Sequence, residues 1–471
     1  MKGRLLIEGA WVDGASVDVL RDKYRGNVYG EMAVASPGQV DQAVASAARA
    51  VAERSLSPYQ RYRILLEASR IIAARAEPLM ELLRDEAGFT RADGQNEVSR
   101  CVQTLELAAE EAKRLQGELV PMQAADGIKR RMGFTLRFPL GVVCAITPFN
   151  SPLNIVAHKI APALAGGNAV IIKPSELAPL GAVALCEALL DAGLPPERLS
   201  LVHGDGTAIG TQLLADPRIA FYAFTGSTRV GRIIQREAGL RKTQLELGSI
   251  ASTLVCHDAD IDTAIPKILN AGLRKAGQVC TSTQMLFVDR RIAGPFQDKL
   301  LAAARTLRYG DPADPATDIG PMISAHHAQR AQAWINEAVA AGATLLLGGH
   351  CEGTVLAPTI LTNVAPHLRV RCEEIFAPVI SLITYDDLDA ALAQINGTPF
   401  GLSVGCFTAN LHQAFDLAHK LRFGGIHINE ASSARVDAMP FGGVKDSGFG
   451  REGPAYAIRE MTEERLVTIA Y

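Results

Sequence analysis

The feature that most constrains the fold is a regular alternation of short apolar runs with helical segments, which begins at Gly141. Each interval between runs is long enough for a helix, and the runs lie at 141–147, 169–172, 199–202, 221–224 and 245–247. Such spacing is typical of βαβ units, in which a crossover helix returns the chain to the next parallel strand. The sequence therefore predicts an α/β fold with a parallel sheet in this region.

Two other regions extend this pattern. Residues 5–35 predict short strands and turns, and helical spacing of apolar residues begins near Pro37 and recurs at 65–72 and 94–114. Beyond Ser252 a second alternating series predicts strands at 253–256, 285–288, 343–347 and 380–384. We therefore expect two α/β domains in succession, the first of them opened by helices.

The composition excludes several classes of function. A formal net charge of −3 over 471 residues provides no basic surplus for nucleic acid. Eight scattered cysteines form no CxxC pair and no metal-type spacing with histidine, which predicts no bound metal and a reduced, cytoplasmic compartment. The N-terminal apolar run is too short for a signal peptide, and prolines and polar residues interrupt the apolar region 141–172. We expect neither export nor a membrane span.

Cys280 lies in the turn 277–282, behind a predicted helix, where its thiol can face a cleft. A cysteine attacks carbonyl groups as the thiolate, so it needs a neighbouring base. Glu246, at the end of an apolar run, is a candidate, because an apolar environment raises a carboxyl pKa toward neutrality. An inert buried thiol and an ion-paired carboxylate on an edge strand are the alternatives.

Other polar residues follow predicted parallel strands at the edge where α/β proteins bind ligands. Asn150 could donate to an oxyanion, Lys173 and Glu176 could hold a ribose, and Ser227 opens a predicted helix suited to a phosphate. A self-bonded turn and a helix cap are the alternatives for Asn150 and Ser227. The dinucleotide fingerprint GxGxxG does not appear at these positions.

Taken together, these motifs resemble those of the aldehyde dehydrogenase superfamily over nearly the whole chain. The resemblance rests on the asparagine motif at 147–152, Lys-Pro-x-Glu at 173–176, Phe-Thr-Gly-Ser at 224–227, Glu-Leu-Gly at 246–248, Gly-Gln-x-Cys at 277–280, Glu-Glu-Ile-Phe-Ala-Pro-Val at 373–379 and Pro-Phe-Gly-Gly at 440–443. All of them occur in the order that the family has.

The resemblance implies a mechanism of NAD(P)-dependent aldehyde oxidation. Cys280 would attack the aldehyde, Asn150 and the backbone N–H of Cys280 would hold the oxyanion, and Glu246 would activate the water that hydrolyses the thioester. Lys159 and Glu452 resemble the proton-relay pair of the family. The implied cofactor-binding residues are Thr147, Pro148, Lys173, Glu176, Gly226, Ser227, Glu374 and Phe376.

The resemblance also implies a domain organisation. It comprises a Rossmann-type cofactor domain with a five-stranded sheet at 1–117 and 139–248, an α/β catalytic domain at 249–453, and oligomerisation segments at 118–138 and 454–471. Extended pieces at 118–122 and 133–138, joined by a turn at 124–127, are expected within the first of these segments. A homodimer or homotetramer is the expected assembly.

Departures from the usual family pattern bear on the substrate. His158 stands where many relatives carry a large aromatic residue, which indicates a polar channel, and Val279 replaces the arginine of phosphate-recognising members. The segment that contains Arg435, upstream of Met439-Pro440, resembles the corresponding segment of the family branch that acts on lactaldehyde and other small hydroxy or anionic aldehydes. Arg100 at the channel mouth and Phe441 are further candidate substrate residues, with surface ion pairing as the alternative for both arginines.

Three questions follow from the resemblance. A CoA-acylating semialdehyde dehydrogenase is a rival function, although such members usually lack a base at the position of Glu246. A catalytically silent dinucleotide-binding protein is another, although Cys280, Glu246 and Asn150 are all present. Glu176 favours NAD over NADP, because its carboxylate would accept a hydrogen bond from a ribose 2′-hydroxyl and repel a 2′-phosphate.

Overall fold

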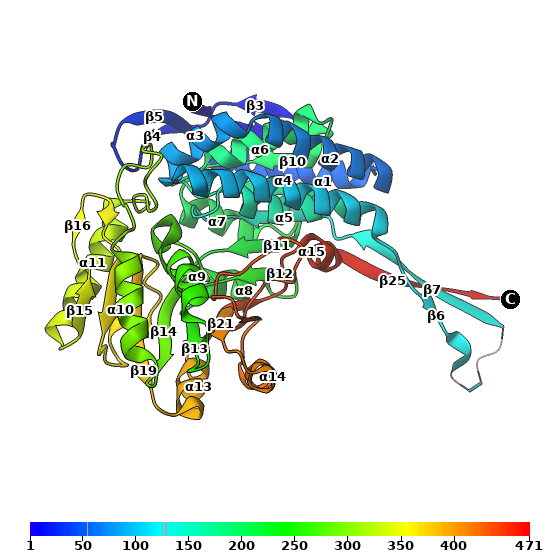
Figure 1. Ribbon diagram of the computed structural model, residues 1–471. Coiled ribbons are helices and arrows are strands. Elements are labelled where there is room, and N and C mark those ends of the chain that lie inside the picture. The colour runs from blue at the N-terminus through cyan, green and yellow to red at the C-terminus, as the bar shows by residue number, and fades with distance from the viewer. Residues whose placement is uncertain (54, 125, 128–129) are drawn as a thin grey trace.

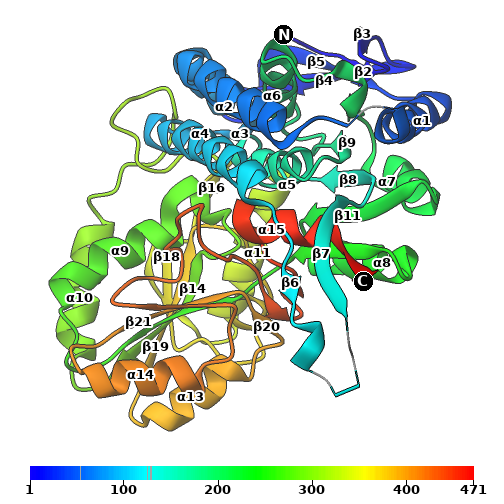
Figure 2. The ribbon, with the colours of Figure 1, turned by 90° about the vertical axis from the view of Figure 1, so that its right-hand side faces the viewer.

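The computed structural model describes residues 1–53, 55–124, 126–127 and 130–471. Two large sheets, each covered by helices, lie beside one another, and a narrow three-stranded arm projects from the body (Figures 1 and 2). The predicted α/β class is confirmed. Among the described residues no helix is both long enough and apolar enough to cross a membrane.

The first sheet contains the predicted parallel series. Its five central strands run parallel and match the five apolar runs in the sequence. Three more strands extend it through antiparallel pairings, so the expected five-stranded sheet has eight strands. In spatial order they are β24 (Gly448–Phe449), β12 (Lys242–Glu246), β11 (Ile219–Thr225), β8 (Val142–Ile146), β9 (Ala169–Lys173), β10 (Leu199–Leu201), β2 (Leu5–Ile7) and β3 (Ala10–Val12).

Helices cover both faces of this sheet, and its strands β8, β9 and β11 are accordingly apolar at nearly every position. Val40, Ala43 and Val44 pack against one face from α1, and α7 and α8 complete that layer. The opposite layer consists of α2 to α6. The bounds are α1 (Pro37–Glu53), α2 (Pro58–Ala74), α3 (Ala76–Ala87), α4 (Arg91–Arg114), α5 (Asn154–Ala165), α6 (Leu180–Asp191), α7 (Gly206–Ala215) and α8 (Thr228–Ala238). Helix α3 lies outside the expected helical segments.

The second sheet has seven strands and contains the second predicted series. All neighbouring pairs are parallel except β15 and β18. The strand expected at 343–347 therefore exists as an antiparallel edge strand and not as a member of the parallel series. In order the strands are β15 (Thr344–Leu347), β18 (Thr359–Thr362), β19 (Val379–Tyr385), β14 (Thr283–Asp289), β13 (Ala251–Val255), β21 (Ser403–Phe407) and β22 (Gly425–Ile428).

Smaller elements complete the body. The helices of the second sheet are α9 (Ile261–Leu273), α10 (Ala293–Ala304), α11 (Ala325–Ala340), α12 (Arg369–Cys372), α13 (Leu388–Asn396) and α14 (Leu411–Lys420). A three-stranded sheet near the N-terminus joins β1 (Lys2–Gly3), β5 (Val28–Val34) and β4 (Ser16–Arg21), and two short pairs join β16 (Cys351–Glu352) to β17 (Val355–Leu356) and β20 (Phe400–Gly401) to β23 (Val444–Lys445).

The arm pairs segments that are far apart in the sequence. Strand β7 (Arg131–Pro139) lies antiparallel between β6 (Leu119–Val120) and β25 (Thr462–Ala470), as Figure 1 shows. The expected hairpin is therefore present, although its predicted turn at 124–127 includes Ala125, which lies outside the described residues. The preceding helix α15 (Pro454–Glu460) packs on α4 and α5, so only the strand of the segment 454–471 joins the arm.

A glycine-rich loop at 440–453 connects the two large sheets. Its strand β24 pairs with β12 of the first sheet, with Glu246 in register opposite Gly448. Ser447 donates a hydrogen bond to the carbonyl oxygen of Gly248 at 2.7 Å, and Phe441 forms a bridge with Glu452. Because Ser447 also accepts a hydrogen bond from the backbone N–H of Gly401 at 3.0 Å, just before β21, the loop links residues next to both sheets.

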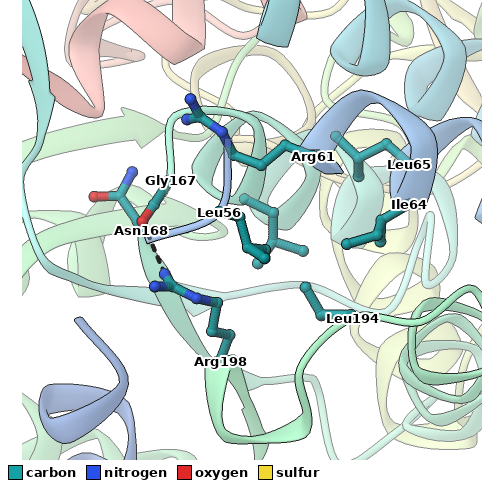
Figure 3. A pocket seen from close by; sticks show the side chains of 9 residues that line it. Leu56, Arg61, Ile64, Leu65, Gly167, Asn168, Leu194 and Arg198 are labelled. Atoms are coloured by element: carbon teal, nitrogen blue, oxygen red, sulfur yellow. Dashed lines mark hydrogen bonds between the residues drawn. The ribbon is translucent and has the colours of Figure 1, made fainter. Parts of the chain in front are cut away.

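A small cavity behind the first sheet belongs to the packing of α2. Figure 3 shows the apolar side chains of Leu56, Ile64 and Leu194 around it and Arg198 bonded to the carbonyl of Gly167 at 3.0 Å. Arg61 also lines this cavity and donates to the carbonyl oxygen of Ala165 at 2.6 Å. These contacts tie helix α2 to the end of α5.

Candidate active site

The turn that carries Cys280 is conformationally strained. After α9 ends, Lys275 and Ala276 adopt left-handed backbone conformations with φ of 52° and 51°. A left-handed residue other than glycine costs about 1–2 kcal/mol, so the surroundings must hold the turn in place. Gly277 must be glycine, because a Cβ there would lie 2.1 Å from the carbonyl oxygen of Ala377. The turn brings the Cys280 thiol to the junction of two hollows.

The two hollows meet at Cys280 and Asn150, which line both of them. The first, called here the cofactor cleft, is bordered by Glu246, Glu374 and Phe376. The second, called here the substrate hollow, is bordered by Arg274, Ser433 and Arg435. A group bound in either hollow therefore reaches the same thiol.

Glu246 ends strand β12 and is 2% exposed. Burial, together with the negative charge of Glu452, raises the pKa of the Glu246 carboxyl to about 7. Its Oε1 atom has no hydrogen-bond partner among the described residues. Burial and the neighbouring Glu246 raise the pKa of the Cys280 thiol well above its usual value, so the resting nucleophile is a thiol that needs a proton acceptor.

Asn150 reaches the nucleophile turn from the loop that follows β8. Its Nδ2 donates to the carbonyl oxygen of Gln278 at 2.8 Å, and the side chain is buried. The same amide nitrogen carries a second hydrogen, which can be donated to an oxygen bound at Cys280. The geometry therefore suits the predicted oxyanion donor.

Lys159 and Glu452, which the family resemblance implied as a proton-relay pair, form a buried ion pair. Lys159 Nζ lies 2.8 Å from Glu452 Oε1, and both side chains are buried. Arg435 approaches the other oxygen, Oε2, at 2.7 Å. Although burial alone would raise it, the charges of Lys159 and Arg435 hold the pKa of Glu452 far below its ordinary range. Glu452 is therefore ionised between two cations.

His158 lies behind the substrate hollow and does not line it. Its Nε2 is 2.8 Å from Asp437 Oδ1, and its ring is fully buried. Burial and the charge of Arg435 lower the pKa of His158, which keeps the ring neutral. The polar channel that was expected from this histidine is lined instead by Asn154 at the start of α5.

Arg100 lines the substrate hollow but already has a carboxylate partner. Its Nη2 and Nε donate to the two oxygens of Asp437 at 2.6 and 3.1 Å, in a bidentate pair. Asp437, which the sequence did not single out, also accepts from Asn154. Surface pairing, the alternative for Arg100 and Arg435, is excluded because each pairs with a buried carboxylate.

Arg274 is a second residue that the sequence reasoning missed. It lies six positions before Cys280, lines the substrate hollow, and donates to Ser433 Oγ at 3.3 Å. Among the described residues no carboxylate forms an ion pair with it, and burial lowers the pKa of its guanidinium. A cation six positions before the nucleophile was the available signal.

The predicted cofactor-binding residues surround the cofactor cleft and the neighbouring edge of the first sheet. Pro148, Gly226 and Ser227 line the cleft, and Ser227 caps α8 by accepting from Val230 N at 3.4 Å. Lys173 Nζ pairs with Glu176 at 3.0 Å beyond the end of β9. Together, the N–H groups of a helix N-terminus and a lysine–carboxylate pair at the same edge of the sheet have the donors and acceptors that a dinucleotide requires.

The opposite wall of the cleft comes from the second sheet. Glu374 accepts from Ser249 N at 2.9 Å, and burial raises the pKa of its carboxyl to about 7. Phe376, with φ of 52°, meets the ring of Phe149 edge to face at 6.0 Å. Thr147 Oγ1 is buried without a hydrogen-bond partner in the described part of the chain. These features fit a nicotinamide dinucleotide between the two sheets.

Two residues of α11 also line the cleft and were not predicted. His327 packs on Phe149 at 5.7 Å between ring centroids, and Arg330 donates to the carbonyl of Ile375 at 2.6 Å. Their helix carries no motif that would single them out in one sequence. Within residues 1–53, 55–124, 126–127 and 130–471, no cluster of three or more histidine, cysteine, aspartate or glutamate side chains is arranged to hold a metal ion.

Sequence comparison gives one family match and strong similarity to characterised relatives. Residues 11–467 match the model of the aldehyde dehydrogenase family. The chain is 44% identical over 465 residues to 3-sulfolactaldehyde dehydrogenase from Priestia aryabhattai, which covers 99% of this chain and 97% of that protein. It is 35% identical over 471 residues to lactaldehyde dehydrogenase from Methanocaldococcus jannaschii, covering 99% and 100%.

Structural comparison gives the same family. Aldehyde dehydrogenase 21 from Physcomitrella patens, solved in complex with the reaction product succinate, superposes with a TM-score of 0.97 at 33% identity, covering 100% of this chain and 98% of that chain. Glyceraldehyde-3-phosphate dehydrogenase from Methanocaldococcus jannaschii, complexed with NADP, superposes with a TM-score of 0.93 at 35% identity, covering 97% and 100%.

Proposed function

This chain belongs to the aldehyde dehydrogenase family and is an NAD(P)-dependent enzyme of that family, and from this premise we propose that it oxidises a small aldehyde bearing an anionic group to the carboxylic acid. The family resemblance seen in the motifs and the expected fold are confirmed. The proposal about the substrate rests on one observation: the Arg274 guanidinium lines the substrate hollow and forms no direct ion pair with any described carboxylate, although the charge of the buried Asp93 acts on it.

The charges around the substrate hollow can be accounted for one by one. Four cationic side chains line it, and three have a carboxylate partner: Arg100 has Asp437, Arg435 has Glu452, and Lys275 has Glu97. Arg274 has none among the described residues. A partly buried guanidinium that no described carboxylate contacts directly, although the charge of Asp93 acts on it, favours an anionic ligand, because the ligand then adds a contacting negative charge.

Hydroxyl groups beside Arg274 add to the anion site. Ser433 Oγ accepts from Arg274 and lies 2.9 Å from Thr281 Oγ1, so the two hydroxyls can also donate to a bound oxyanion. A sulfonate or a carboxylate presents several acceptor oxygens that suit a guanidinium flanked by hydroxyls. The names of similar proteins agree with such a ligand, since one acts on sulfolactaldehyde and another was solved with succinate.

The first chemical step follows from the positions of three side chains. The Cys280 sulfur forms a bond to the aldehyde carbon while its proton passes to the adjacent Glu246 carboxylate, whose raised pKa makes it an effective acceptor. The carbonyl oxygen gains the negative charge. Asn150 Nδ2 and the backbone N–H of Cys280 would donate to that oxygen.

Pro148, Ser227 and Phe376 are among the residues that would hold a nicotinamide dinucleotide in the cleft, where it would supply the hydride acceptor needed to convert the Cys280 adduct to a thioester. Glu246 then removes a proton from water, which attacks the thioester carbon. The carbon–sulfur bond breaks, the acid is released, and the thiol is restored. The charge of Glu452 raises the pKa of Glu246, and the charge of Lys159 lowers it. Lys159 and Glu452 form the proposed route by which the proton leaves Glu246.

Two further proposals concern the cofactor and the assembly. We propose NAD as the preferred cofactor, because Glu176 is half exposed at the sheet edge and its charge opposes a 2′-phosphate. We also propose a homodimer or homotetramer assembled through the arm, because Leu119, Leu466 and Ile469 expose 75%, 58% and 47% of their surface there.

The substrate proposal is tested by comparing an anionic and a neutral aldehyde. We expect wild-type protein to oxidise succinic semialdehyde with a higher kcat/KM than butanal, and Arg274→Met to lower only the former, by about 100-fold. Arg70→Met, at an exposed arginine on α2, is the matched control and should leave both values unchanged. An equal loss for both aldehydes in Arg274→Met would contradict the proposed anion site.

The same assay addresses the rival CoA-acylating reaction. With Glu246 beside the thioester, the expected product is the free acid, whether or not CoA is added. If mass spectrometry detected acyl-CoA in place of the acid, the thioester would be resolved by transfer to the CoA thiol and not by hydrolysis.

A further inference from the structure

A buried ion pair that the proposed reaction does not use joins the nucleophile turn to helix α4. Lys275 Nζ lies 2.8 Å from Glu97 Oε2, and the exposed fractions of the two side chains are 4% and 0%. Lys275 also lies over the ring of Phe89, 4.1 Å from its centroid. The charge of Lys275 is therefore neutralised by Glu97 inside the protein and is not available to bind an anion in the substrate hollow.

The Lys275 ammonium makes a second contact that reaches the oxyanion loop. Its Nζ donates to the backbone carbonyl oxygen of Asn150 at 3.1 Å. In return, the side chain of Asn150 donates to the carbonyl oxygen of Gln278 in the nucleophile turn. Each loop therefore uses a side chain to bind a backbone carbonyl of the other, and the two contacts fix their separation and relative orientation.

Glu97 holds the other end of this connection. Its carboxylate accepts from the hydroxyl of Ser151 at 2.7 Å and from the backbone N–H of Asn154 at 2.8 Å. It thereby fixes the residues that follow Asn150 and the start of α5. Because it also binds Lys275, one carboxylate determines the position of both loops.

The backbone of the turn shows why such a connection is needed. Lys275 and Ala276 are left-handed, a conformation that non-glycine residues leave unless the surroundings prevent it. Gln278 adds a local restraint by donating to the carbonyl of Lys275 at 3.2 Å. The Lys275 side chain anchors this conformation to helix α4 through Glu97.

We propose that Lys275 is a positioning residue that, together with Glu97, sets the distance between the Asn150 amide and Cys280 and so forms the oxyanion site. The inference rests on the roles proposed above for Asn150 and Cys280. Loss of the ammonium would release both the strained turn and the Asn150 loop. Reactions that build negative charge on an oxygen at Cys280 would then slow, whereas reactions of the thiol that build none would not.

Two reagents separate these effects. Hydrolysis of p-nitrophenyl acetate at Cys280 passes through a tetrahedral oxyanion and needs neither aldehyde nor cofactor. Alkylation of the thiol by iodoacetamide displaces iodide from a CH₂ carbon and leaves no new charge on an oxygen. Both rates depend on the accessible thiol, but only the first depends on the placement of Asn150.

We expect Lys275→Met to slow ester hydrolysis by about 10- to 100-fold and to leave the alkylation rate and its pH profile unchanged. Lys275→Arg, which keeps the charge and the donors, should restore much of the ester rate. Lys299→Met, at an exposed lysine on α10 that pairs with Asp262, is the matched control and should behave as wild type. Glu97→Gln keeps an oxygen that can accept from the backbone N–H of Asn154 but removes the negative charge that pairs with Lys275. It should therefore also lower the ester rate.

A wild-type ester rate in Lys275→Met would overturn the inference, and so would an equal fall in ester hydrolysis and alkylation, because that pattern indicates collapse of the turn. If Lys275→Met does not fold, the same two rates in Glu97→Gln decide. Failure of the proposed function is distinguishable. If wild-type protein shows no ester hydrolysis that depends on Cys280, the site roles fall and the inference falls with them, whereas loss of the Lys275 effect alone leaves the proposed function intact.

Discussion

Arg435 Nη2 lies 2.7 Å from Glu452 Oε2, and this contact joins the wall of the substrate hollow to the buried pair that Glu452 forms with Lys159. The Arg435 guanidinium also lies over the Phe441 ring at 3.8 Å. The residue that the sequence suggested for substrate binding therefore also sets the charge of the proposed proton route.

Arg435→Met should destabilise the protein, because it removes one of the two cations that hold Glu452 ionised. The expected fall in the free energy of unfolding is about 3–5 kcal/mol at neutral pH. The folded-state pKa of Glu452 is lowered, so its stabilising contribution is present above the unfolded value of 4.5 and disappears in acid. The difference from wild type in urea denaturation should therefore narrow as the pH falls below 4.5. An unchanged urea midpoint of Arg435→Met at neutral pH would contradict the predicted destabilisation.

Glu246 should control the pH dependence of turnover. Its carboxyl must be ionised to accept a proton, and its pKa is raised to about 7, so kcat should rise with pH through neutrality and level off above it. Glu246→Gln should lower kcat by about 10²- to 10⁴-fold and remove this rise. Steady-state rates measured across this pH range provide the check, and a variant that retained the same rise would assign the titration to another group.

Glu176 should determine the preference between the two cofactors. In Glu176→Gln the repulsion of a 2′-phosphate is lost while Lys173 remains available to it, so the KM for NADP should fall by about 10-fold relative to that for NAD. Glu106→Gln, at an exposed position on α4, is the control. An unchanged ratio of the two KM values would show that Glu176 does not contact the ribose.

Leu466 should contribute to assembly through the arm. Leu466→Asp places a charge in the exposed apolar surface of β25 and should shift the protein toward monomers in sedimentation velocity experiments. Phe415→Asp, at a side chain of α14 that is 62% exposed, tests whether any added surface charge has this effect. Identical sedimentation of Leu466→Asp and wild type would exclude the arm as an interface.

Local patterns in the sequence were sufficient to predict the parallel series and the residues at the ends of its strands. Apolar runs bounded by turns identify β8, β9 and β11, and polar residues directly after them, such as Asn150 and Lys173, lie at one edge of the sheet for topological reasons. The pairing of Lys159 with Glu452 came from the family resemblance, since 293 positions separate the two residues.

The remaining features depend on contacts between distant segments, which one sequence does not reveal. Asp437 pairs with Arg100 across more than 300 positions. Because this carboxylate neutralises the Arg100 guanidinium, Arg100 is less available to bind an anionic ligand. That no described carboxylate forms a direct ion pair with Arg274 is likewise visible only when its neighbours in the fold are known. His158 was expected in the channel because its chemical type was known but its orientation was not.

The pairing of β12 with β24 has a consequence for the chain as a whole. Because the loop after Phe441 returns to complete the edge of the first sheet, a fragment that ends at Gly248 would expose β12 as an open edge. An edge strand whose backbone N–H and C=O groups are unpaired recruits strands from other molecules. Residues 1–248 should therefore not fold into a stable unit on their own, and when expressed alone they should aggregate. Co-expression with residues 249–471 should keep them in solution, because that segment supplies the missing strand β24.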